Sequence, residues 1–332
     1  MTALSAEKQW AKHDLHGHLV VLTTPFHDDL SIDYDAFRAN VQKTRDLRCV
    51  TGYYVNSIFN EATALTLAER KRLTEATIAA VPKTMPVVVA IGGVPLADAI
   101  ELAQHAQKAG AALLTLWPPV FGYRSRAGVM SYFRAVIESV SMPVSVYRSG
   151  LDEFGYFSSL EEVRELIAYP HVCAIKEASL SLTKYLEIVD ALGDRVAVSC
   201  PLDEYWIAGR MLMPSRAPDW FLGTSRPLIC ETKDRPYLSE LRDAANRGDG
   251  AAVEAALGRM IRITNALHTK FLEGGAHNVA LTKKVTELLG YRGGKVRPPL
   301  SSPDESFLVG VREILLDAGL LKTHDQRTEV TA

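Results

Sequence analysis

Residues 172–179 read Val-Cys-Ala-Ile-Lys-Glu-Ala-Ser, an apolar run that leads into a lysine and a glutamate. This pattern is typical of a buried parallel strand whose carboxyl end carries charge. An amine held among apolar neighbours loses solvation, so we expect the pKa of Lys176 to fall from about 10.4 toward values at which the free amine is a nucleophile. Schiff-base chemistry requires such an amine. Taken alone, the stretch also fits a lysine that pairs with Glu177 or another carboxylate and only ends a strand.

Short apolar runs and helical stretches alternate along the first 230 residues. Strands are expected at 19–26, 50–56, 86–93, 112–120, 143–147, 172–176, 195–200 and 220–224. Helices are expected at 33–47, 66–81, 95–109, 127–140, 158–168, 182–192 and 203–213. Asp33 is the expected cap of the first of these helices, and Thr66-Leu-Ala-Glu69 is an expected capping box at the start of the second. Eight apolar strands separated by helices imply parallel pairing under a helical cover, and they favour a closed barrel over an open sheet. We therefore predict the α/β class, with a (β/α)8 TIM barrel.

An open, doubly wound sheet is the second choice for the fold. Such a sheet usually binds a nucleotide at a glycine-rich turn after its first strand. The segment after the first expected strand is Thr24-Pro25-Phe26-His27-Asp28 and has no Gly-x-Gly-x-x-Gly pattern. We therefore expect no nicotinamide or flavin cofactor.

Helical periodicity without strands continues after the barrel. The expected helices there are 237–247, 251–272, 278–289 and 304–318. The predicted organisation is an N-terminal extension (1–17), a barrel (18–230), a C-terminal helical extension (231–324) and a loose tail (325–332).

The composition is that of an ordinary globular protein that acts on small molecules. The chain has 332 residues, of which 47% are hydrophobic and 23% charged, and its net charge is −2. This charge argues against a nucleic-acid or polybasic membrane partner, and no apolar run reaches the roughly 18 residues of a membrane span. The four cysteines form no Cys-x-x-Cys pair and have no histidines at zinc spacing, so neither a metal nor a disulfide framework is expected. The first 18 residues do not resemble a signal peptide, and we expect a cytoplasmic protein.

Chemistry in a βα barrel gathers at the carboxyl ends of the strands. The ends of the fifth and sixth expected strands carry Tyr147 and Lys176. These side chains should project into the same mouth, where the phenol could relay a proton to the amine or to a bound carbonyl. No aspartate or histidine pair competes for a metal at the strand ends, which disfavours metal-dependent aldol chemistry.

These segments resemble the dihydrodipicolinate synthase and N-acetylneuraminate lyase family of class I, Schiff-base aldolases. Ile175-Lys176-Glu177-Ala178 matches the family's Schiff-base lysine segment, and Pro143-Val-Ser-Val-Tyr147 matches the strand that bears its catalytic tyrosine. Residues 61–66 and 86–93 match the second and third units in order and spacing. The resemblance covers about residues 18–320. It implies a barrel with C-terminal helices, catalytic roles for Lys176 and Tyr147, and a homo-oligomer, either a dimer or a tetramer.

The chain departs from the family after the second strand. Members that bind pyruvate usually carry Gly-Thr-Thr-Gly-Glu there, whereas this chain has Ser57-Ile58-Phe59-Asn60-Glu61. A carboxylate facing two bulky apolar side chains would lose charge-assisted hydrogen bonds worth roughly 1.5 to 3 kcal/mol each. Pyruvate specificity is therefore an open question.

Two further family residues have no direct equivalent. Tyr123 is a shifted candidate for the tyrosine that a neighbouring subunit often lends, and Arg148 is a substitute for the usual substrate-facing arginine. The predicted substrate-binding residues are Ser57, Ile58, Phe59, Asn60, Tyr123, Arg148, Thr224 and Ser225.

The expected function is a lyase or aldolase in which Lys176 forms a Schiff base with a 2-oxo acid or related carbonyl and Tyr147 relays protons. One alternative is a more apolar carbonyl substrate, with Phe59, Trp117, Phe121 and Tyr123 lining its pocket or only packing the barrel rim. Another is a non-catalytic ligand-binding barrel that kept Lys176. Glu177 is expected to be structural, as a counter-ion or helix cap.

Overall fold

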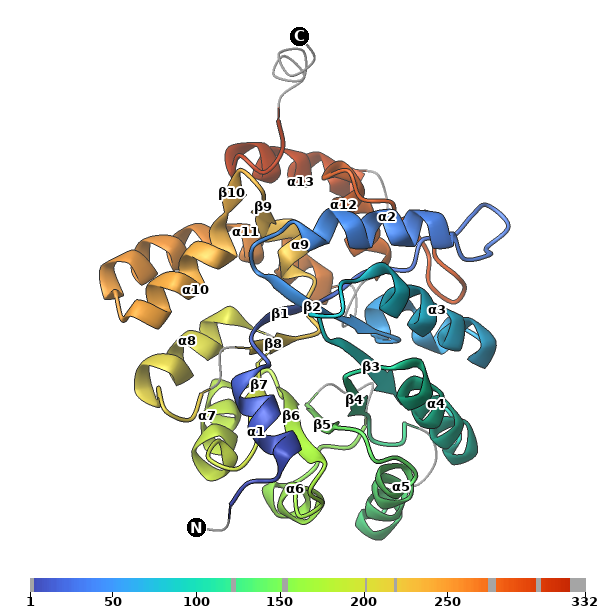
Figure 1. Cartoon of the computed structure of the whole chain (residues 1–332). Coiled ribbons are helices and arrows are strands. Elements are labelled where there is room, and N and C mark those ends of the chain that lie inside the picture. The colour runs from blue at the N-terminus through green and yellow to red at the C-terminus, as the bar shows by residue number, and fades with distance from the viewer. Residues whose placement is uncertain are drawn as a thin grey trace. The chain divides into compact units, whose positions relative to one another are not determined.

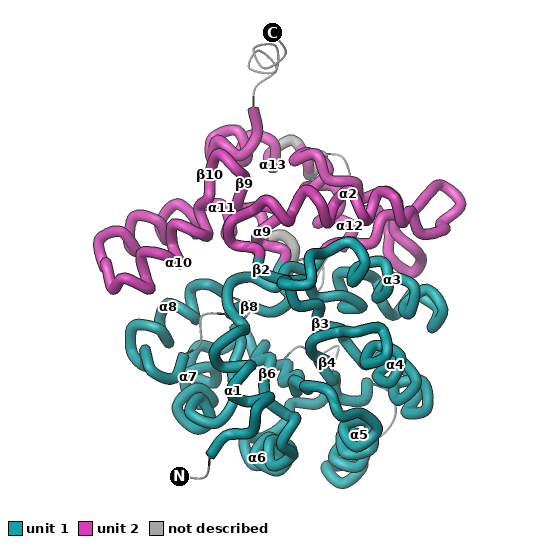
Figure 2. Tube along the Cα trace, viewed as in Figure 1, with its two compact units in different colours: residues 1–21, 51–224 teal, residues 22–50, 225–332 magenta. Residues whose placement is uncertain are grey.

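The computed structural model describes residues 3–120, 124–150, 155–200, 202–217, 220–273, 279–302 and 306–322. The fold is a (β/α)8 TIM barrel with additional C-terminal helices, as predicted (Figure 1). The chain divides into two compact units, residues 1–21 with 51–224 and residues 22–50 with 225–332 (Figure 2). The predicted boundaries at residues 17, 230 and 324 stay predictions.

Eight parallel strands form one sheet in the order β7-β6-β5-β4-β3-β2-β1-β8. Their bounds are β1 Gly17–Val21, β2 Val50–Val55, β3 Val87–Ile91, β4 Leu113–Leu116, β5 Val144–Ser149, β6 Val172–Ala178, β7 Ala197–Ser199 and β8 Trp220–Leu222. Each strand was expected from the sequence, although the ends differ by a few residues. β4 stops before Pro118 and Pro119 because proline has no N–H to donate to a strand ladder.

The first helix of the first unit precedes β1, and each of the other six follows one of the strands β2 to β7. They are α1 Ala6–His13, α3 Leu67–Ala80, α4 Leu96–Ala109, α5 Arg126–Glu138, α6 Leu160–Leu166, α7 Leu182–Leu192 and α8 Asp203–Leu212. The expected capping box at the start of α3 is confirmed, with Thr66 and Glu69 each bonding the other's backbone. The helix α1 was not predicted, because its sequence holds few apolar residues.

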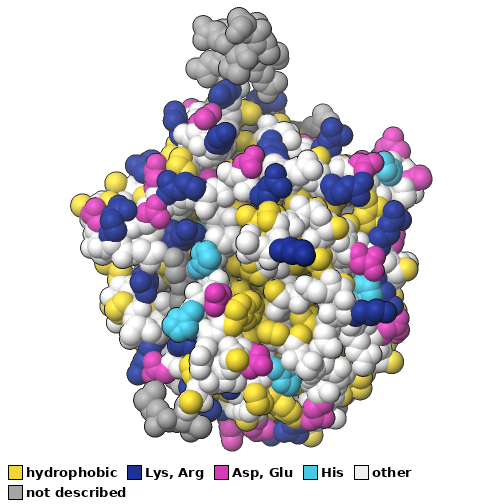
Figure 3. All heavy atoms as spheres, in the orientation of Figure 1, with side chains coloured by type: hydrophobic (Ala, Val, Ile, Leu, Met, Phe, Trp, Pro, Cys, Tyr) yellow, Lys and Arg dark blue, Asp and Glu magenta, His cyan; other side chains and the backbone are white. Residues whose placement is uncertain are grey.

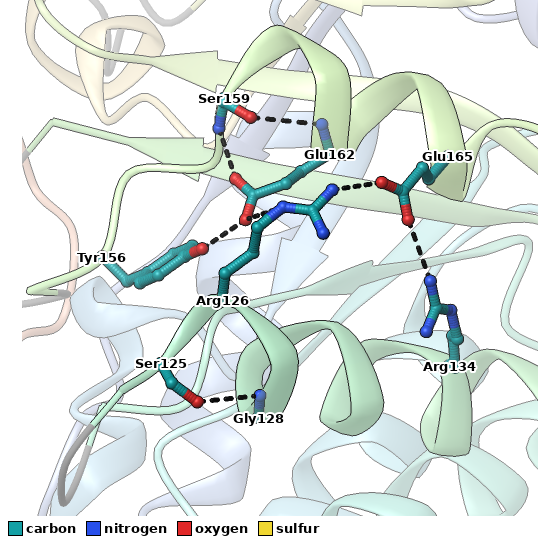
Figure 4. Close-up of polar contacts among 8 residues, drawn as sticks. All are labelled: Ser125, Arg126, Gly128, Arg134, Tyr156, Ser159, Glu162 and Glu165. Atoms are coloured by element: carbon teal, nitrogen blue, oxygen red, sulfur yellow. Dashed lines mark hydrogen bonds and ion pairs between the residues drawn. The ribbon is translucent and has the colours of Figure 1, made fainter.

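Charged and polar side chains join α5 to α6 (Figure 4). Arg126 pairs with Glu165, which also accepts a hydrogen bond of 2.9 Å from Arg134. Glu162 caps its own helix through the Ser159 backbone and accepts a hydrogen bond from the hydroxyl of Tyr156. These contacts hold the residues directly before α6, from Tyr156 to Ser159, against the helix.

The second unit is mainly helical. Its elements are α2 Tyr34–Arg45, α9 Arg226–Cys230, β9 Glu231–Thr232, β10 Arg235–Pro236, α10 Tyr237–Arg247, α11 Gly250–Glu273, α12 Val279–Leu288 and α13 Ser306–Asp317. Asp33 caps α2, as predicted, by accepting a hydrogen bond of 2.8 Å from the Ala36 N–H. The prediction that no strand follows the barrel was wrong, because β9 and β10 form a short antiparallel hairpin. Strands of two residues are too short to produce a readable alternation. The expected tail, 325–332, lies outside the described residues.

Alternation along the barrel strands sorts side chains between the interior and the helices. One cluster of buried residues lines the barrel interior and extends to residues in and next to α1. We call it the interior cluster. Its members are Ala11, Leu15, Leu19, Val21, Tyr54, Phe59, Val88, Ala90, Leu113, Trp117, Tyr147, Cys173, Ala174, Ala178, Ala197, Trp220 and Leu222. Three aromatic members, Tyr54, Trp117 and Tyr147, lie in or just after the carboxyl-terminal halves of β2, β4 and β5, where the candidate site lies.

Candidate functional site

Lys176 lies inside the barrel between two aromatic rings. It is paired in register with Tyr147 of the neighbouring strand, and its side chain reaches the rings of Tyr147 and Tyr54. The distances from Nζ to the ring centroids are 4.6 Å for Tyr147 and 4.5 Å for Tyr54. Burial lowers the pKa of Lys176 to about 7. Within the described ranges, no carboxylate lies within ion-pair distance of this amine.

Glu177 does not pair with Lys176 but with Arg148. The Nη1 of Arg148 lies 2.7 Å from Glu177 Oε2, and its Nε donates a hydrogen bond of 2.8 Å to the Ser158 carbonyl. The guanidinium also lies 3.9 Å from the centroid of the Phe157 ring. Burial raises the pKa of Glu177, although Arg148 and Ser179 act in the opposite direction. Because adjacent residues on a strand face opposite ways, this pair lies on the opposite side of β5 and β6 from the Lys176 amine.

Because Gly223 has no side chain, there is space beside it for the side chain of Lys176. The φ of Gly223 is +78°, and a Cβ at this position would lie 2.5 Å from Lys176 Nζ and 2.8 Å from Tyr54 Cδ1. A side chain here would therefore clash with the amine as well as strain the backbone. Gly223 directly follows β8, so the end of this strand borders the site.

Tyr54 is held in place by Trp117. The Trp117 Nε1 donates a hydrogen bond of 3.2 Å to the hydroxyl oxygen of Tyr54. The Trp117 ring packs over Gly92, where a Cβ would approach the ring atom Cγ to 2.8 Å. The centroid of the Trp117 ring lies 6.2 Å from that of Tyr147. Burial raises the pKa of Tyr54 well above its usual range, so the phenol stays neutral.

The predicted substrate-binding loop after β2 forms a 3₁₀ turn, η1, over Ile58–Asn60. The N–H and the hydroxyl of Ser57 both donate to the side-chain oxygen of Asn60, at 3.0 and 3.2 Å. Phe59 belongs to the interior cluster, and Ile58 packs against that cluster while partly buried. The loop thus brings apolar side chains to the same cluster as Tyr54, Trp117 and Tyr147.

The remaining predicted site residues are less closely tied to the amine. Thr224 is buried and follows Gly223, whereas Ser225 is buried in the second unit. Arg148 is engaged by Glu177 as described, and Tyr123 lies outside the described residues. Their roles in substrate binding stay predictions.

Three further observations describe the molecule around the site. The described helices include none that is long and apolar enough to span a membrane. The same residues contain no group of three histidine, cysteine, aspartate or glutamate side chains that could hold a metal ion. On the face drawn in Figure 3, leaving aside its grey atoms, Lys and Arg side chains are interspersed with Asp and Glu.

The sequence pattern that defines the Dihydrodipicolinate synthetase family matches residues 14–214. The chain belongs to this family. It is similar to the 4-hydroxy-tetrahydrodipicolinate synthase of Methanococcoides burtonii, with 29% identity over 86% of this chain and 92% of that protein. It is also similar to the N-acetylneuraminate lyase of Rhizobium meliloti, with 27% identity over 90% of this chain and 94% of the relative. The predicted family and enzyme class, a lyase of class I aldolase type, are confirmed.

Solved structures of the dihydrodipicolinate synthetase family share the fold of this chain. The dihydrodipicolinate synthase of Aquifex aeolicus aligns with a TM-score of 0.80 and 22% identity, covering 93% of this chain and 100% of its own. The prophage protein YagE of E. coli K12, solved in complex with pyruvate, aligns with a TM-score of 0.79 and 22% identity, covering 92% and 99%. At this level of identity the likeness supports the barrel and C-terminal helices alone.

Sequence reasoning about this member of the dihydrodipicolinate synthetase family missed two residues around the amine, Tyr54 and Gly223. Ser199, at the end of an expected strand, is paired in register with Lys176 on β7. Neither the hydroxyl of Ser199 nor that of Ser145 on β5 has a hydrogen-bond partner among the described residues. Tyr54 could have been found from the alternation of β2, but its neighbour Tyr53 made the inward-facing tyrosine ambiguous.

Proposed function

We propose that this chain is a Schiff-base lyase in which Lys176 bonds to the carbonyl carbon of a 2-oxo acid and Tyr147 relays protons. The observation that carries the proposal is the Lys176 amine, only 6% exposed as a residue and with no carboxylate in ion-pair distance among the described residues. Near neutral pH, a pKa of about 7 leaves a large fraction of this amine uncharged and nucleophilic.

The proposed covalent chemistry begins with the lone pair of Lys176 Nζ. This pair forms a bond to the carbonyl carbon, the carbonyl oxygen takes up protons, and water leaves. In total, one amine, one carbonyl and one proton give one protonated imine and one water. The C4 hydroxyl of the substrate then gives up its proton to the relay, the carbon-carbon bond breaks and an aldehyde leaves. The imine accepts the electron pair of the broken bond, which gives an enamine, and the proton held by the relay returns to the enamine carbon. This protonation and the addition of water release the product and restore the amine.

Proton transfer in these steps is assigned to Tyr147. Its ring centroid lies 4.6 Å from Nζ, on the strand next to that of the lysine, which supports a role for its hydroxyl at the atoms bonded to the amine. A phenol that donates and accepts in turn can shuttle a proton between the carbinolamine oxygen and the substrate.

A 2-oxo acid is the proposed substrate class. The similarity to an N-acetylneuraminate lyase supports this choice, because N-acetylneuraminate is itself a 2-oxo acid. Thr224, which follows the Gly223 backbone beside the amine, is proposed to hold the carboxylate. We also propose that the protein is cytoplasmic and forms a homo-oligomer, either a dimer or a tetramer. Sedimentation velocity tests the oligomer, and finding only a monomer would contradict it.

A second candidate is an apolar carbonyl substrate larger than pyruvate. It is favoured by the loop after β2, because Phe59 joins the interior cluster and Ile58 packs against it. Charge on a ligand next to these side chains would be poorly solvated, whereas an aromatic or aliphatic substituent would gain contact area.

The test is a turnover panel of 4-hydroxy-2-oxo acids whose substituents range from polar to aromatic, with release of pyruvate and aldehyde as readouts. We expect at least one compound to be cleaved by the wild type and not by Lys176→Met. Lys184→Met is the control, because the Lys184 amine also lies over an aromatic ring, that of Phe157, but is exposed. Cleavage that survives Lys176→Met would overturn the proposal, and preference for aromatic substituents would favour the second candidate.

A further inference from the structure

Tyr54 presents its ring face to the amine as closely as Tyr147 does. The centroid of Tyr54 lies 4.5 Å from Lys176 Nζ, against 4.6 Å for Tyr147. The two rings come from β2 and β5, strands that are not neighbours in the sheet, so the amine is contacted from two directions. The mechanism proposed above uses Tyr147 and gives no role to Tyr54.

The ring of Tyr54 is fixed in this orientation by its surroundings. The Trp117 N–H donates to its hydroxyl oxygen, and Trp117 itself fits against Gly92. The absence of a side chain at Gly223 lets the ring and the amine meet. A ring that is already held in place needs no reorganisation when charge develops beside it.

Two roles for a buried tyrosine can be separated by chemistry. As an acid or base, Tyr54 would have to release a proton, but its burial strongly favours the neutral phenol. As an aromatic face, it attracts a cation through its quadrupole, and this attraction is strong where water is excluded. The contact observed here is between the amine and the ring face, which matches the second role.

The charge on Nζ changes during a Schiff-base reaction. The attacking amine is neutral, whereas the nitrogen of the protonated imine carries a full positive charge. A contact that is stronger with the cation than with the neutral amine favours the imine over the starting state. We propose that Tyr54 is a catalytic residue whose ring face stabilises the protonated imine on Lys176, with Trp117 as its positioning residue. This inference rests on the proposed function.

The experiment replaces residue 54 with phenylalanine and then with phenylalanines of increasing ring fluorination. Fluorine withdraws electron density from the ring face while largely preserving its shape, and the fold can be checked by circular dichroism. The readout is the equilibrium fraction of Lys176 trapped as imine by borohydride with pyruvate, or with the compound cleaved best in the panel. The same substitutions at Tyr53 are the matched control, because Tyr53 is equally buried and adjacent on β2 but faces the other side.

We expect Tyr54→Phe to keep imine formation within a few-fold of the wild type, and heavy fluorination at 54 to lower its equilibrium constant by about tenfold. Fluorination at position 53 should leave the constant unchanged. A flat series at position 54, or an equal loss at position 53, would overturn the inference. A loss of imine in Tyr54→Phe that is larger than the loss in Trp117→Phe would assign the effect to a chemical role of the hydroxyl and would also overturn the inference. If the wild type forms no imine with any carbonyl, the proposed function fails first.

The positioning role of Trp117 is tested by a double-mutant cycle. Trp117→Phe removes the N–H donor and should lower the imine fraction when Tyr54 is present. In the Tyr54→Phe background there is no hydroxyl to hold, so the same change should have a smaller effect. Equal effects in the two backgrounds would show that Trp117 acts only by packing.

Discussion

Lys176 and Glu177 are neighbours in the sequence with opposite environments. The lysine faces two aromatic rings inside the barrel, and the glutamate forms a buried ion pair with Arg148. The neighbouring strand β5 is divided in the same way, because Tyr147 pairs in register with Lys176 and Arg148 pairs in register with Glu177. Because Glu177 pairs with Arg148, it does not stabilise a positive charge on the Lys176 amine. Residues 172–179 therefore fit a lysine nucleophile better than a lysine that only pairs with Glu177 at the end of a strand.

The hydroxyl of Tyr147 provides the first prediction. Tyr147→Phe should lower turnover by about 10²-fold or more, because proton transfer at the carbinolamine and the enamine loses its relay. The control is Tyr185→Phe, which removes a buried hydroxyl on α7 that has no hydrogen-bond partner among the described residues. Steady-state kinetics on the best substrate measures both variants. Unchanged turnover in Tyr147→Phe would remove this residue from the mechanism.

The lowered pKa of Lys176 predicts a pH-dependent cost in stability. The pKa is about 7 in the folded chain against 10.5 in the unfolded chain, so between these pH values the unfolded state binds more protons. The free energy of unfolding gains at most about 1.4 kcal/mol per pH unit from this residue as pH rises through the window. Below pH 7 the destabilisation of the folded state by the Lys176 amine is constant, and above pH 10.5 it is zero.

Lys176→Met removes this cost. We expect the variant to be more stable than the wild type at pH 7, with an advantage that shrinks between pH 8 and pH 10. Urea unfolding at several pH values measures the difference. An advantage that does not change with pH would mean that the amine is not desolvated in the folded state.

At the scale of the element, the end of β8 limits the space around the amine. Gly223→Ala should abolish imine formation, because its Cβ would lie 2.5 Å from Lys176 Nζ. Gly248→Ala is the matched control, since Gly248 also has a positive φ, +70°, but a Cβ there meets no atom within 4 Å. Both variants carry the backbone strain of roughly 1 kcal/mol or more, and only one carries the clash. Equal trapping of pyruvate by the two variants would refute this account of Gly223.

The turn after β2 sets the specificity in this account. Ile58→Thr should lower KM for pyruvate, because a hydroxyl replaces an apolar side chain near the carboxylate. The double variant with Phe59→Thr should bind pyruvate more tightly still, at a stability cost of about 3 kcal/mol for losing a buried aromatic side chain. Kinetics with pyruvate and with an aromatic 2-oxo acid would measure the shift. If pyruvate affinity does not improve in either variant, the loop is not the determinant.

At the scale of the whole molecule, long-range order was easier to predict than local detail. The eight strands and the C-terminal helices were predicted because apolar runs separated by amphipathic stretches recur over more than 200 residues. The helix α1 and the hairpin of β9 and β10 were missed because a polar helix and two-residue strands leave little periodicity.

The candidate site was predicted only in part. Lys176 and Tyr147 were chosen because reactive side chains at adjacent strand ends must meet in a parallel barrel. Tyr54, Trp117 and Gly223 contact the amine or one another from segments distant in sequence, and only the folded barrel shows that they meet. The orientation of Arg148 toward Glu177 likewise depends on register.

The central claim is that Lys176 forms a covalent bond with a carbonyl substrate. The most direct measurement is borohydride reduction with pyruvate and then with a panel of 2-oxo acids, followed by digestion and mass spectrometry. Lys283 is an internal control, because it is also buried and lies 4.4 Å from the centroid of Phe26, but its amine donates to the Lys295 carbonyl. We predict that at least one compound adds its reduced mass to the peptide with Lys176 and not to the peptide with Lys283. Absence of any adduct on Lys176, or equal labelling of the two lysines, would contradict the claim.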